Sequence, residues 1–210
     1  MSEDLGKRGQ IPTSTWYDRY PKIFKKSSEV ILRKELKILS YGCSSGEEAA
    51  TLADKYFAED THKIIGVDIN DDVITKAKHT NRHSSRVEFF NNKDILLKNF
   101  APFDVIFAMS VLCSYPPTKT VDDCSELITF DSFNDSVAAL DNLLKKDGIL
   151  CIINSNFYFE DSDVSDKYLE VMSSKACGAD VLIVPRFDKK NKRVELEDDY
   201  YGVIFRKIKD

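Results

Sequence analysis

The sequence predicts an α/β fold: a seven-stranded, mostly parallel sheet with helices on both faces and an antiparallel pair of strands at its C-terminal end. The first observation is that short apolar runs alternate with amphipathic helical segments through most of the chain. The second is that these runs are apolar almost throughout, which is typical of parallel strands buried on both faces. The third is that the last two apolar runs have no helix between them.

The first half of the chain supplies three of the predicted strands and two helices. The strands are short apolar runs at Lys37–Tyr41, Lys63–Asp68 and Arg86–Phe90. Apolar residues at helical spacing predict the first helix over Gly46–Phe57. Asn70 is a favourable N-cap, so a second helix is predicted from there to about Thr80.

The second half adds a fourth strand, a helix and the closing strands. Phe103–Met109 is apolar at nearly every position. Ser132 and Asp135 resemble a capping box, which predicts the start of a helix that ends at Lys146–Gly148. The remaining predicted strands are Gly148–Ile153 and the antiparallel pair Asp180–Pro185 and Tyr200–Phe205. The basic run Lys189–Arg193 is predicted to be a solvated hairpin tip, with contact to an acidic partner as the alternative.

Composition and charge limit the classes of function. The 210 residues suit one domain, predicted over residues 37–210 behind an N-terminal helical or lid segment of residues 1–36. A net charge of −5 argues against a protein that coats nucleic acid. The polar start and the lack of an apolar run near the ~20 residues of a membrane span predict a cytoplasmic protein. Five cysteines without a C-x-x-C pair predict neither a metal site nor disulfides.

A loop of small residues follows the first predicted strand. It reads Gly42-Cys43-Ser44-Ser45-Gly46 and continues with Glu47 and Glu48. Small residues allow a ligand to approach the backbone, and the N-terminus of the next helix offers free N–H groups. The pattern G-x-G-x-x-G is not met, and the two acids suit a cationic or neutral ligand better than a pyrophosphate. An ordinary strand-to-helix turn is the alternative.

Polar residues also follow the next three predicted strands. Asp68, 22 positions after Gly46 and followed by Ile69, can accept both hydroxyls of a ribose. Asp94 and Ile95 can flank an adenine, although Asp94 also fits a plain turn. Met109, Ser110 and Val111 end the fourth strand. Because the carboxyl ends of parallel strands meet at one edge, these residues predict a nucleoside pocket without a triphosphate cradle.

This arrangement resembles the class I S-adenosylmethionine-dependent methyltransferases, which share a Rossmann-like sheet. The match runs from about Lys37 to the C-terminus and includes the segments FDVIF and LLKKDGIL. The loop YGCSSGEE at Tyr41–Glu48 looks most like that of the chemotaxis receptor (protein-glutamate) methyltransferases. The segment Thr15-Trp16-Tyr17-Asp18-Arg19 and the run that begins at Ser110 also resemble segments of that family. Ser110 stands where that family has Asn.

The resemblance implies S-adenosyl-L-methionine as the cofactor and a role for each part of the pocket. Asp68 would hold the ribose, and Asp94 and Ile95 would frame the adenine. The loop from Gly42 to Gly46 would lie against the methionyl part. Arg19, paired with Thr15, would contact the methionyl carboxylate, and Glu47 would share in the anchoring.

The methyl acceptor is left open by the sequence. Tyr115, Asn154 and Asn156 are candidates for lining its site, and no general base can be identified. We expect a small molecule or a protein side chain, a carboxylate being one candidate, and neither nucleic acid nor membrane. The alternative is a module that binds the cofactor without catalysis and acts through a protein partner. A nucleotide-dependent oxidoreductase is disfavoured by the broken glycine pattern.

Overall fold

The structure, a computed structural model, describes residues 15–83, 85–93, 95–177, 184–195 and 201–210. The strands of its sheet are β1 (Lys37–Tyr41), β2 (Lys63–Asp68), β3 (Val87–Asn91), β4 (Phe103–Met109), β5 (Leu144–Ile153), β6 (Tyr168–Ser173) and β7 (Gly202–Lys207). The helices are α1 (Pro21–Val30), α2 (Glu47–Thr51), α3 (Asp71–Thr80), α4 (Phe130–Leu143) and the short α5 (Ser174–Cys177). A π-helical turn, η1 (Leu52–Tyr56), continues α2.

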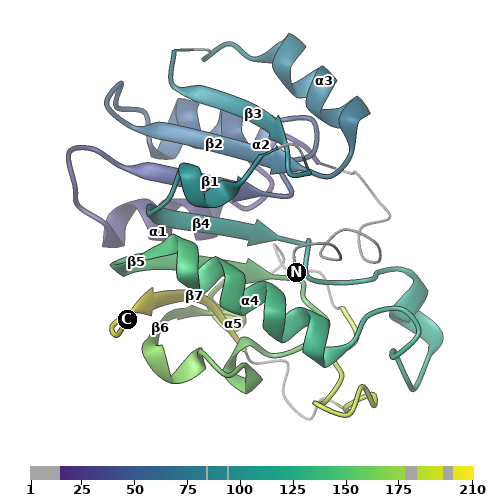
Figure 1. Cartoon of the computed structure of the whole chain (residues 1–210). Coiled ribbons are helices and arrows are strands. Elements are labelled where there is room, and N and C mark those ends of the chain that lie inside the picture. Colours follow the sequence, from purple (N-terminus) through teal and green to yellow (C-terminus); the bar gives the residue numbers. More distant parts are fainter. Residues whose placement is uncertain (1–14, 84, 94, 178–183, 196–200) are drawn as a thin grey trace.

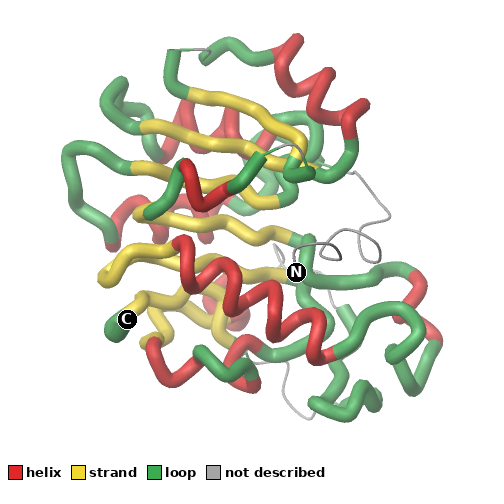
Figure 2. The backbone as a smooth tube through the Cα atoms, in the orientation of Figure 1, coloured by secondary structure: helices red, strands yellow, loops and turns green. Residues whose placement is uncertain are grey.

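The described strands form one seven-stranded sheet in the order β3-β2-β1-β4-β5-β7-β6. Strands β1 to β5 are parallel, whereas β7 pairs antiparallel with both β5 and β6. Figure 1 shows the arrowheads of β1, β2 and β4 at the same edge of the sheet, and Figure 2 shows helices on either side of the strands. The predicted fold, mostly parallel with an antiparallel C-terminal pair, is confirmed.

Alternate residues of the central strands feed two separate cores, one on each face. In β1 and β4, Ile38 and Phe107 belong to the core under α1, α2 and α3, whereas Leu39 and Ile106 belong to the core under α4. All four side chains are fully buried. Because successive side chains of a strand point to opposite faces, a strand covered on both sides must be apolar at every position. This explains the unbroken apolar runs of the sequence.

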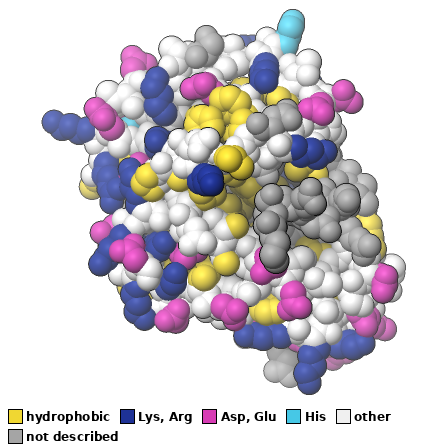
Figure 3. All heavy atoms as spheres, viewed as in Figure 1, with side chains coloured by type: hydrophobic (Ala, Val, Ile, Leu, Met, Phe, Trp, Pro, Cys, Tyr) yellow, Lys and Arg dark blue, Asp and Glu magenta, His cyan; other side chains and the backbone are white. Residues whose placement is uncertain are grey.

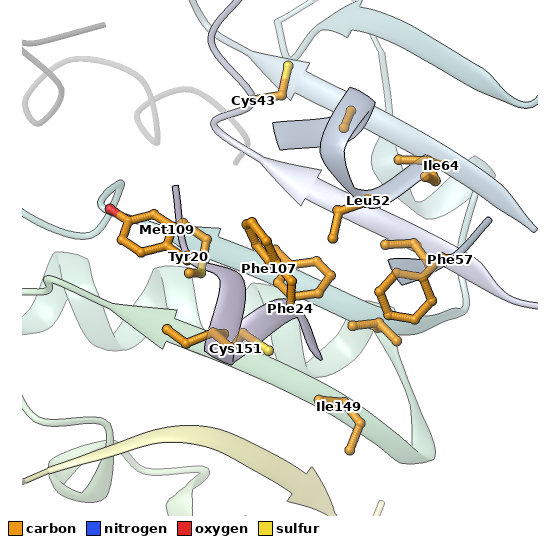
Figure 4. Close-up of a cluster of buried hydrophobic side chains, with 14 of the residues drawn as sticks. Tyr20, Phe24, Cys43, Leu52, Phe57, Ile64, Phe107, Met109, Ile149 and Cys151 are labelled. Carbon is orange, nitrogen blue, oxygen red and sulfur yellow. The ribbon is translucent and has the colours of Figure 1, made fainter. Parts of the chain in front are cut away.

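The first helix belongs to the packed body of the protein, although it precedes the first strand. The ring of Phe24 from α1 meets that of Phe107 edge to face, with 5.4 Å between centroids. Ser27 lies within hydrogen-bond distance of the Cys151 sulfur on β5, at 3.1 Å. Burying Ile23 and Phe24 contributes roughly 1.5–3 kcal/mol each. Within the predicted N-terminal segment, Pro21–Val30 is therefore helical and packs on the sheet beside Phe107 and Cys151 (Figure 4).

Two predicted boundaries near α4 are wrong. The N-cap is Thr129, and the capping box joins it to Ser132, so Ser132 is the third residue of the helix and Asp135 has no part in the cap. The helix ends at Leu143, and β5 already begins at Leu144. Asp147 has a φ of 61°, a left-handed conformation that resembles a helix C-terminus in the sequence but lies within the strand.

The predicted partner of the last strand is also wrong. The strand beside β7 is β6, Tyr168–Ser173, and not Asp180–Pro185. Residues 178–183 lie outside the described residues, and Val184 and Pro185 are not in a strand. Val184, near the end of that run, is buried although it is not part of a strand.

Candidate active site

The candidate site lies where the strand order reverses. From β1 the chain proceeds through β2 and β3 to one edge of the sheet, and β4 then returns to the other side of β1. In doubly wound sheets the loops at such a reversal point diverge, and ligands bind between them at the carboxyl ends of the strands. The residues that follow β1, β2, β4 and β5 therefore build this site.

The small-residue loop after β1 has a left-handed backbone at three positions. These are Gly42 with φ 77°, Ser44 with φ 49° and Gly46 with φ 93°. The amide N–H groups of Gly42 and Cys43 both donate to the carbonyl of Val67, at 2.8 and 2.9 Å. A Cβ on Gly46 would lie 2.9 Å from the Phe89 ring. Glycine is therefore required at position 46 by both conformation and space.

Asp68 ends β2 and closes against this loop. Its side chain is only 3% exposed. One carboxylate oxygen accepts from the Ser44 N–H and the other from the Asn70 N–H, each at 3.0 Å. Each oxygen keeps a second lone pair, because a carboxylate offers about four acceptor sites. The geometry thus leaves Asp68 fixed in one orientation and able to accept two further hydrogen bonds, which fits a ribose diol.

A second acid is brought to the end of β1 by the next helix. Ser40, fully buried in β1, donates its hydroxyl to the Glu48 carboxylate at 2.6 Å. Burial raises the pKa of Glu48 to about 7, against the opposing effects of the Ser40 hydroxyl and the Arg19 charge. Glu47 points elsewhere, since its carboxylate accepts from Ser45 Oγ at 2.7 Å. The ionised form of such a carboxyl group stabilises a nearby cationic ligand such as a sulfonium.

A cluster of three polar side chains joins α1 to the ends of β4 and β5. The hydroxyls of Tyr20 and Ser110 lie 2.9 Å apart. Asn154 Nδ2 donates to the Ser110 hydroxyl at 2.8 Å and to the Tyr20 hydroxyl at 3.2 Å. Ser110 and Asn154 both have positive φ, at 60° and 55°, a conformation that is uncommon outside glycine and is often found at functional sites.

The Tyr20 hydroxyl points toward the site and away from the core. In Figure 4 its ring lies beside Met109, and its oxygen is directed to the side where the arrowheads of β1 and β5 lie. Burial raises the pKa of Tyr20, and the Ser110 hydrogen bond and the Arg19 charge oppose this effect. The phenol is therefore a neutral hydrogen-bonding group at neutral pH.

The other predicted site residues take varied positions. Arg19 lies over the rings of Trp16 and Tyr20, with its guanidinium carbon 4.4 and 4.9 Å from their centroids. Half-buried side chains are found at Thr15, Ile69, Ile95 and Val111. Met109 is buried in the core. Asp94 lies outside the described residues.

Two residues of this site, Tyr20 and Glu48, are absent from the predicted set. Glu48 stands beside the predicted Glu47 in the sequence, and only the pairing with Ser40 distinguishes them. Tyr20 follows Arg19, so a prediction of the whole segment Thr15–Tyr20 would have included it. No local pattern marks Tyr20, because its partners Ser110 and Asn154 are distant in the chain, whereas Ser40, the partner of Glu48, lies only eight residues before it.

The described residues form no group of three or more His, Cys, Asp or Glu side chains that could hold a metal ion. Within the same residues, no helix combines the length and the apolar character that a membrane crossing needs.

Comparison with known proteins assigns this arrangement to a class. Residues 32–199 match the methyltransferase domain family (Methyltransf_31). The chain belongs to this family of methyltransferase domains. No curated protein sequence matches it.

Solved structures agree on the fold. A ribosomal protein L11 methylase from Lactobacillus delbrueckii subsp. bulgaricus is 15% identical with a TM-score of 0.51, over 91% of this chain and 80% of that one. A protein named as an rRNA methylase from Clostridium thermocellum is 12% identical with a TM-score of 0.52, over 94% and 99%. PKMT2 from Rickettsia typhi is 19% identical with a TM-score of 0.46, over 67% of this chain and 26% of that one. This chain thus spans about a quarter of PKMT2.

Proposed function

We propose that this protein transfers a methyl group from S-adenosyl-L-methionine to a small molecule or a protein side chain, a carboxylate being one candidate. The observation that carries the proposal is the convergence of polar groups from the ends of β1, β2, β4 and β5 at the point where the strand order reverses. The Tyr41–Glu48 loop resembles that of the chemotaxis receptor methyltransferases, and this resemblance is the reason for naming a carboxylate as a candidate acceptor.

The chain's own residues supply binding, orientation and charge. Asp68 would accept the ribose hydroxyls, and Ile95 would border the adenine. The loop from Gly42 to Gly46 would hold the methionyl part, and Arg19, together with Thr15, would pair with its carboxylate. The cofactor supplies a methyl group on a sulfonium, which is a good leaving group. Aligning and desolvating the acceptor can then lower the barrier by several kcal/mol without a covalent intermediate.

The polar cluster of Tyr20, Ser110 and Asn154 is the proposed boundary between cofactor and acceptor. Its members come from three different elements and are held in place by mutual hydrogen bonds. A hydroxyl or amide at that position can form a hydrogen bond with the oxygen or nitrogen that receives the methyl group. This bond would orient that atom toward the methyl group. Tyr115, beyond the cluster, borders the acceptor.

Calorimetry with S-adenosylhomocysteine tests the binding site. The wild-type protein should bind it and should not bind NAD. Asp68→Ala should weaken binding about 100-fold, because two hydrogen bonds to a charged group are lost. Asp72→Ala is the control, since Asp72 is an exposed acid on the first turn of α3. Equal affinities for the two variants would refute the assigned pocket.

Turnover is tested with a labelled methyl donor in a cell lysate. The wild-type protein should transfer label to a product, and Asp68→Ala should not. Retained binding of S-adenosylhomocysteine without any labelled product would instead support a module that acts by association. The two measurements together separate a failed pocket from a failed activity.

A further inference from the structure

A hollow of about 350 Å³ lies at the same edge of the sheet as the cofactor loop. Its lining combines the Tyr115 ring and the side chains of Val184, Pro185 and Val194 with three cationic side chains: Lys119, Arg186 and Arg193. The volume is within the range of small-ligand pockets, roughly 300–1,000 Å³. A surface of this kind suits a ligand with an apolar body and a negatively charged end.

The hollow is tied to the ends of β4 and β5 through Asn156. Asn156 Oδ1 accepts from the Ser114 N–H at 2.7 Å, beside Tyr115. Asn156 Nδ2 donates to the Pro185 carbonyl at 2.8 Å. Both walls of the hollow are thus fixed to the loop that carries Asn154, a member of the polar cluster. Asn156, predicted from the sequence to line the acceptor site, does not line this hollow but holds two of its walls in place.

Arg186 is the most informative residue of this hollow. It is 3% exposed, and its Nη1 donates to the carbonyl of Phe157 at 3.0 Å and to the hydroxyl of Ser155 at 2.8 Å. Its guanidinium carbon lies 3.9 Å from the centroid of the Tyr201 ring. In the described part of the chain, no carboxylate lies within ion-pair distance of it. A buried arginine is costly without an anion, so a cation held this firmly at a cavity wall favours an anionic ligand.

The other two cations converge on the same space. Arg193 Nη2 donates to the Lys119 carbonyl at 2.9 Å, which fixes its guanidinium at the wall. Among the described residues, neither Arg193 nor Lys119 forms an ion pair. Lys192 of the same basic run is engaged elsewhere, since it pairs with Asp123 at 2.6 Å. The predicted solvated tip therefore contributes Arg193 to a cavity.

The position of Cys113 connects the hollow with the proposed cofactor site. Burial raises the pKa of the Cys113 thiol, and the positive charges of Arg186 and Arg19 both oppose that effect. The neighbouring residue Leu112 accepts a hydrogen bond from the Asn156 N–H at 3.1 Å, which places Cys113 beside the loop that holds the walls of the hollow. Cys113 also approaches the Ser110 carbonyl, with the sulfur 3.6 Å from the oxygen. The hollow and the polar cluster are neighbours.

We infer that the hollow binds the methyl acceptor, and that this acceptor is a small organic oxyanion, a carboxylate or a phosphate with an apolar body. The inference rests on the proposed function, because it assigns the substrate class of the same site. Arg186 and Arg193 would bind the oxyanion by charge-assisted hydrogen bonds, and Lys119 would act from the rim as a mobile positive charge. The valines, Pro185 and Tyr115 would contact the apolar body.

The test measures binding of simple probes by titration calorimetry. Phenylacetate and phenyl phosphate carry the two oxyanions on one ring, and 2-phenylethanol is the neutral counterpart. At least one anion should bind the wild-type protein, and the neutral probe should bind at least about tenfold more weakly. The anion that binds more tightly shows whether the hollow prefers a carboxylate or a phosphate. Equal binding of the neutral probe would overturn the inference.

Variants locate the binding to the hollow. Arg193→Gln should weaken the anion about tenfold, and Lys119→Gln, at an exposed position, about threefold. Lys190→Gln removes the same charge from the exposed part of the basic run and should have no effect. If all three variants bind the anion equally, the hollow is not its site. An unchanged affinity for S-adenosylhomocysteine in every variant confirms that the variants are folded. If the wild-type protein does not bind S-adenosylhomocysteine, the proposed function is refuted instead.

Discussion

Glu48 is a residue whose charge depends on pH in the physiological range. Burial raises its pKa to about 7, although Ser40 and Arg19 favour the charged form. A carboxyl group with a raised pKa in the folded state contributes stability below its ordinary pKa and loses that contribution as the pH rises through the folded value. The free energy of unfolding should therefore decrease between about pH 4.5 and about pH 7, by at most about 3 kcal/mol.

The same titration should govern the preference for the charged cofactor. Ionised Glu48 stabilises a sulfonium but gains little from the neutral sulfur of S-adenosylhomocysteine. The ratio of the affinities for S-adenosylmethionine and S-adenosylhomocysteine should rise severalfold from about pH 6 to about pH 8. Glu48→Gln should abolish this dependence, whereas Glu47→Gln should retain it. A ratio that does not change with pH in the wild-type protein would show that Glu48 does not face the sulfur.

Tyr20 is the second residue whose role can be isolated. Tyr20→Phe removes only the hydroxyl that meets Ser110 and Asn154, so the ring stays packed beside Phe24. We expect labelled methyl transfer to fall about tenfold with little change in S-adenosylhomocysteine affinity. Tyr17→Phe is the matched control, because Tyr17 is exposed and its hydroxyl donates to Asp54. Parallel losses of turnover and cofactor affinity would place Tyr20 in the cofactor site instead.

At the scale of elements, one buried acid on α4 holds the antiparallel end of the sheet. Asp141 is 2% exposed and accepts from Lys167, Tyr168 and Lys207, the last two on β6 and β7. Burial acts to raise its pKa, but the hydrogen bonds from Lys167, Lys207 and Tyr168 outweigh this, so the pKa is lowered. Its contribution to stability is present above the ordinary carboxyl pKa and lost as the pH falls through the folded value.

Asp141→Asn should therefore destabilise the protein by about 3 kcal/mol, since two lysines lose their anion and one of them, Lys207, is buried. Denaturant unfolding at neutral pH measures the change. Asp135→Asn, at an exposed position of the same helix, should change stability by less than about 0.5 kcal/mol. A similar effect of the two substitutions would mean that Asp141 does not bind the two strands together.

The elements that the sequence predicts correctly are those whose pattern is local. Strands β1, β2 and β4 are covered on both faces, and their unbroken apolar runs identify them at once. Strand β6 lies at the edge, and its pairing with β7 is interrupted between Glu170 and Met172 and again between Met172 and Ser173. These irregularities remove the two-residue period that marks a half-buried strand. The more apolar run at Asp180–Pro185 therefore resembles a strand in the sequence more closely than β6 does.

The candidate site follows the same rule. The loop from Gly42 to Gly46 and Asp68 are predictable because strand ends and helix starts are written in consecutive residues. Tyr20 of this site and Arg186 of the hollow are not predictable. Tyr20 is held by a hydrogen bond with Ser110, and Arg186 by one with Ser155, and both partners are distant in the chain. Long-range contacts of this kind leave no periodic pattern in a single sequence.

At the scale of the whole molecule, the charge distribution disfavours the binding of extended polyanions. The net charge is −5, and on the face shown in Figure 3 acidic and basic side chains are interspersed. The three cations of the hollow form a local exception, large enough for a small oxyanion. A nucleic-acid backbone requires a continuous basic field over many phosphates. The proposed acceptor is therefore a small anion and not a polyanion.

Binding of the cofactor product should stabilise the entire chain, because the proposed site joins loops from four central strands. S-adenosylhomocysteine at 100 times its dissociation constant should add about 2.7 kcal/mol. For a domain of this size that corresponds to a rise in Tm of roughly 6–10 °C in a thermal scan. NAD at the same concentration should leave the Tm unchanged, and Asp68→Ala should lose most of the rise. A shift with NAD would contradict the cofactor assignment, and an undiminished shift in Asp68→Ala would remove Asp68 from the site.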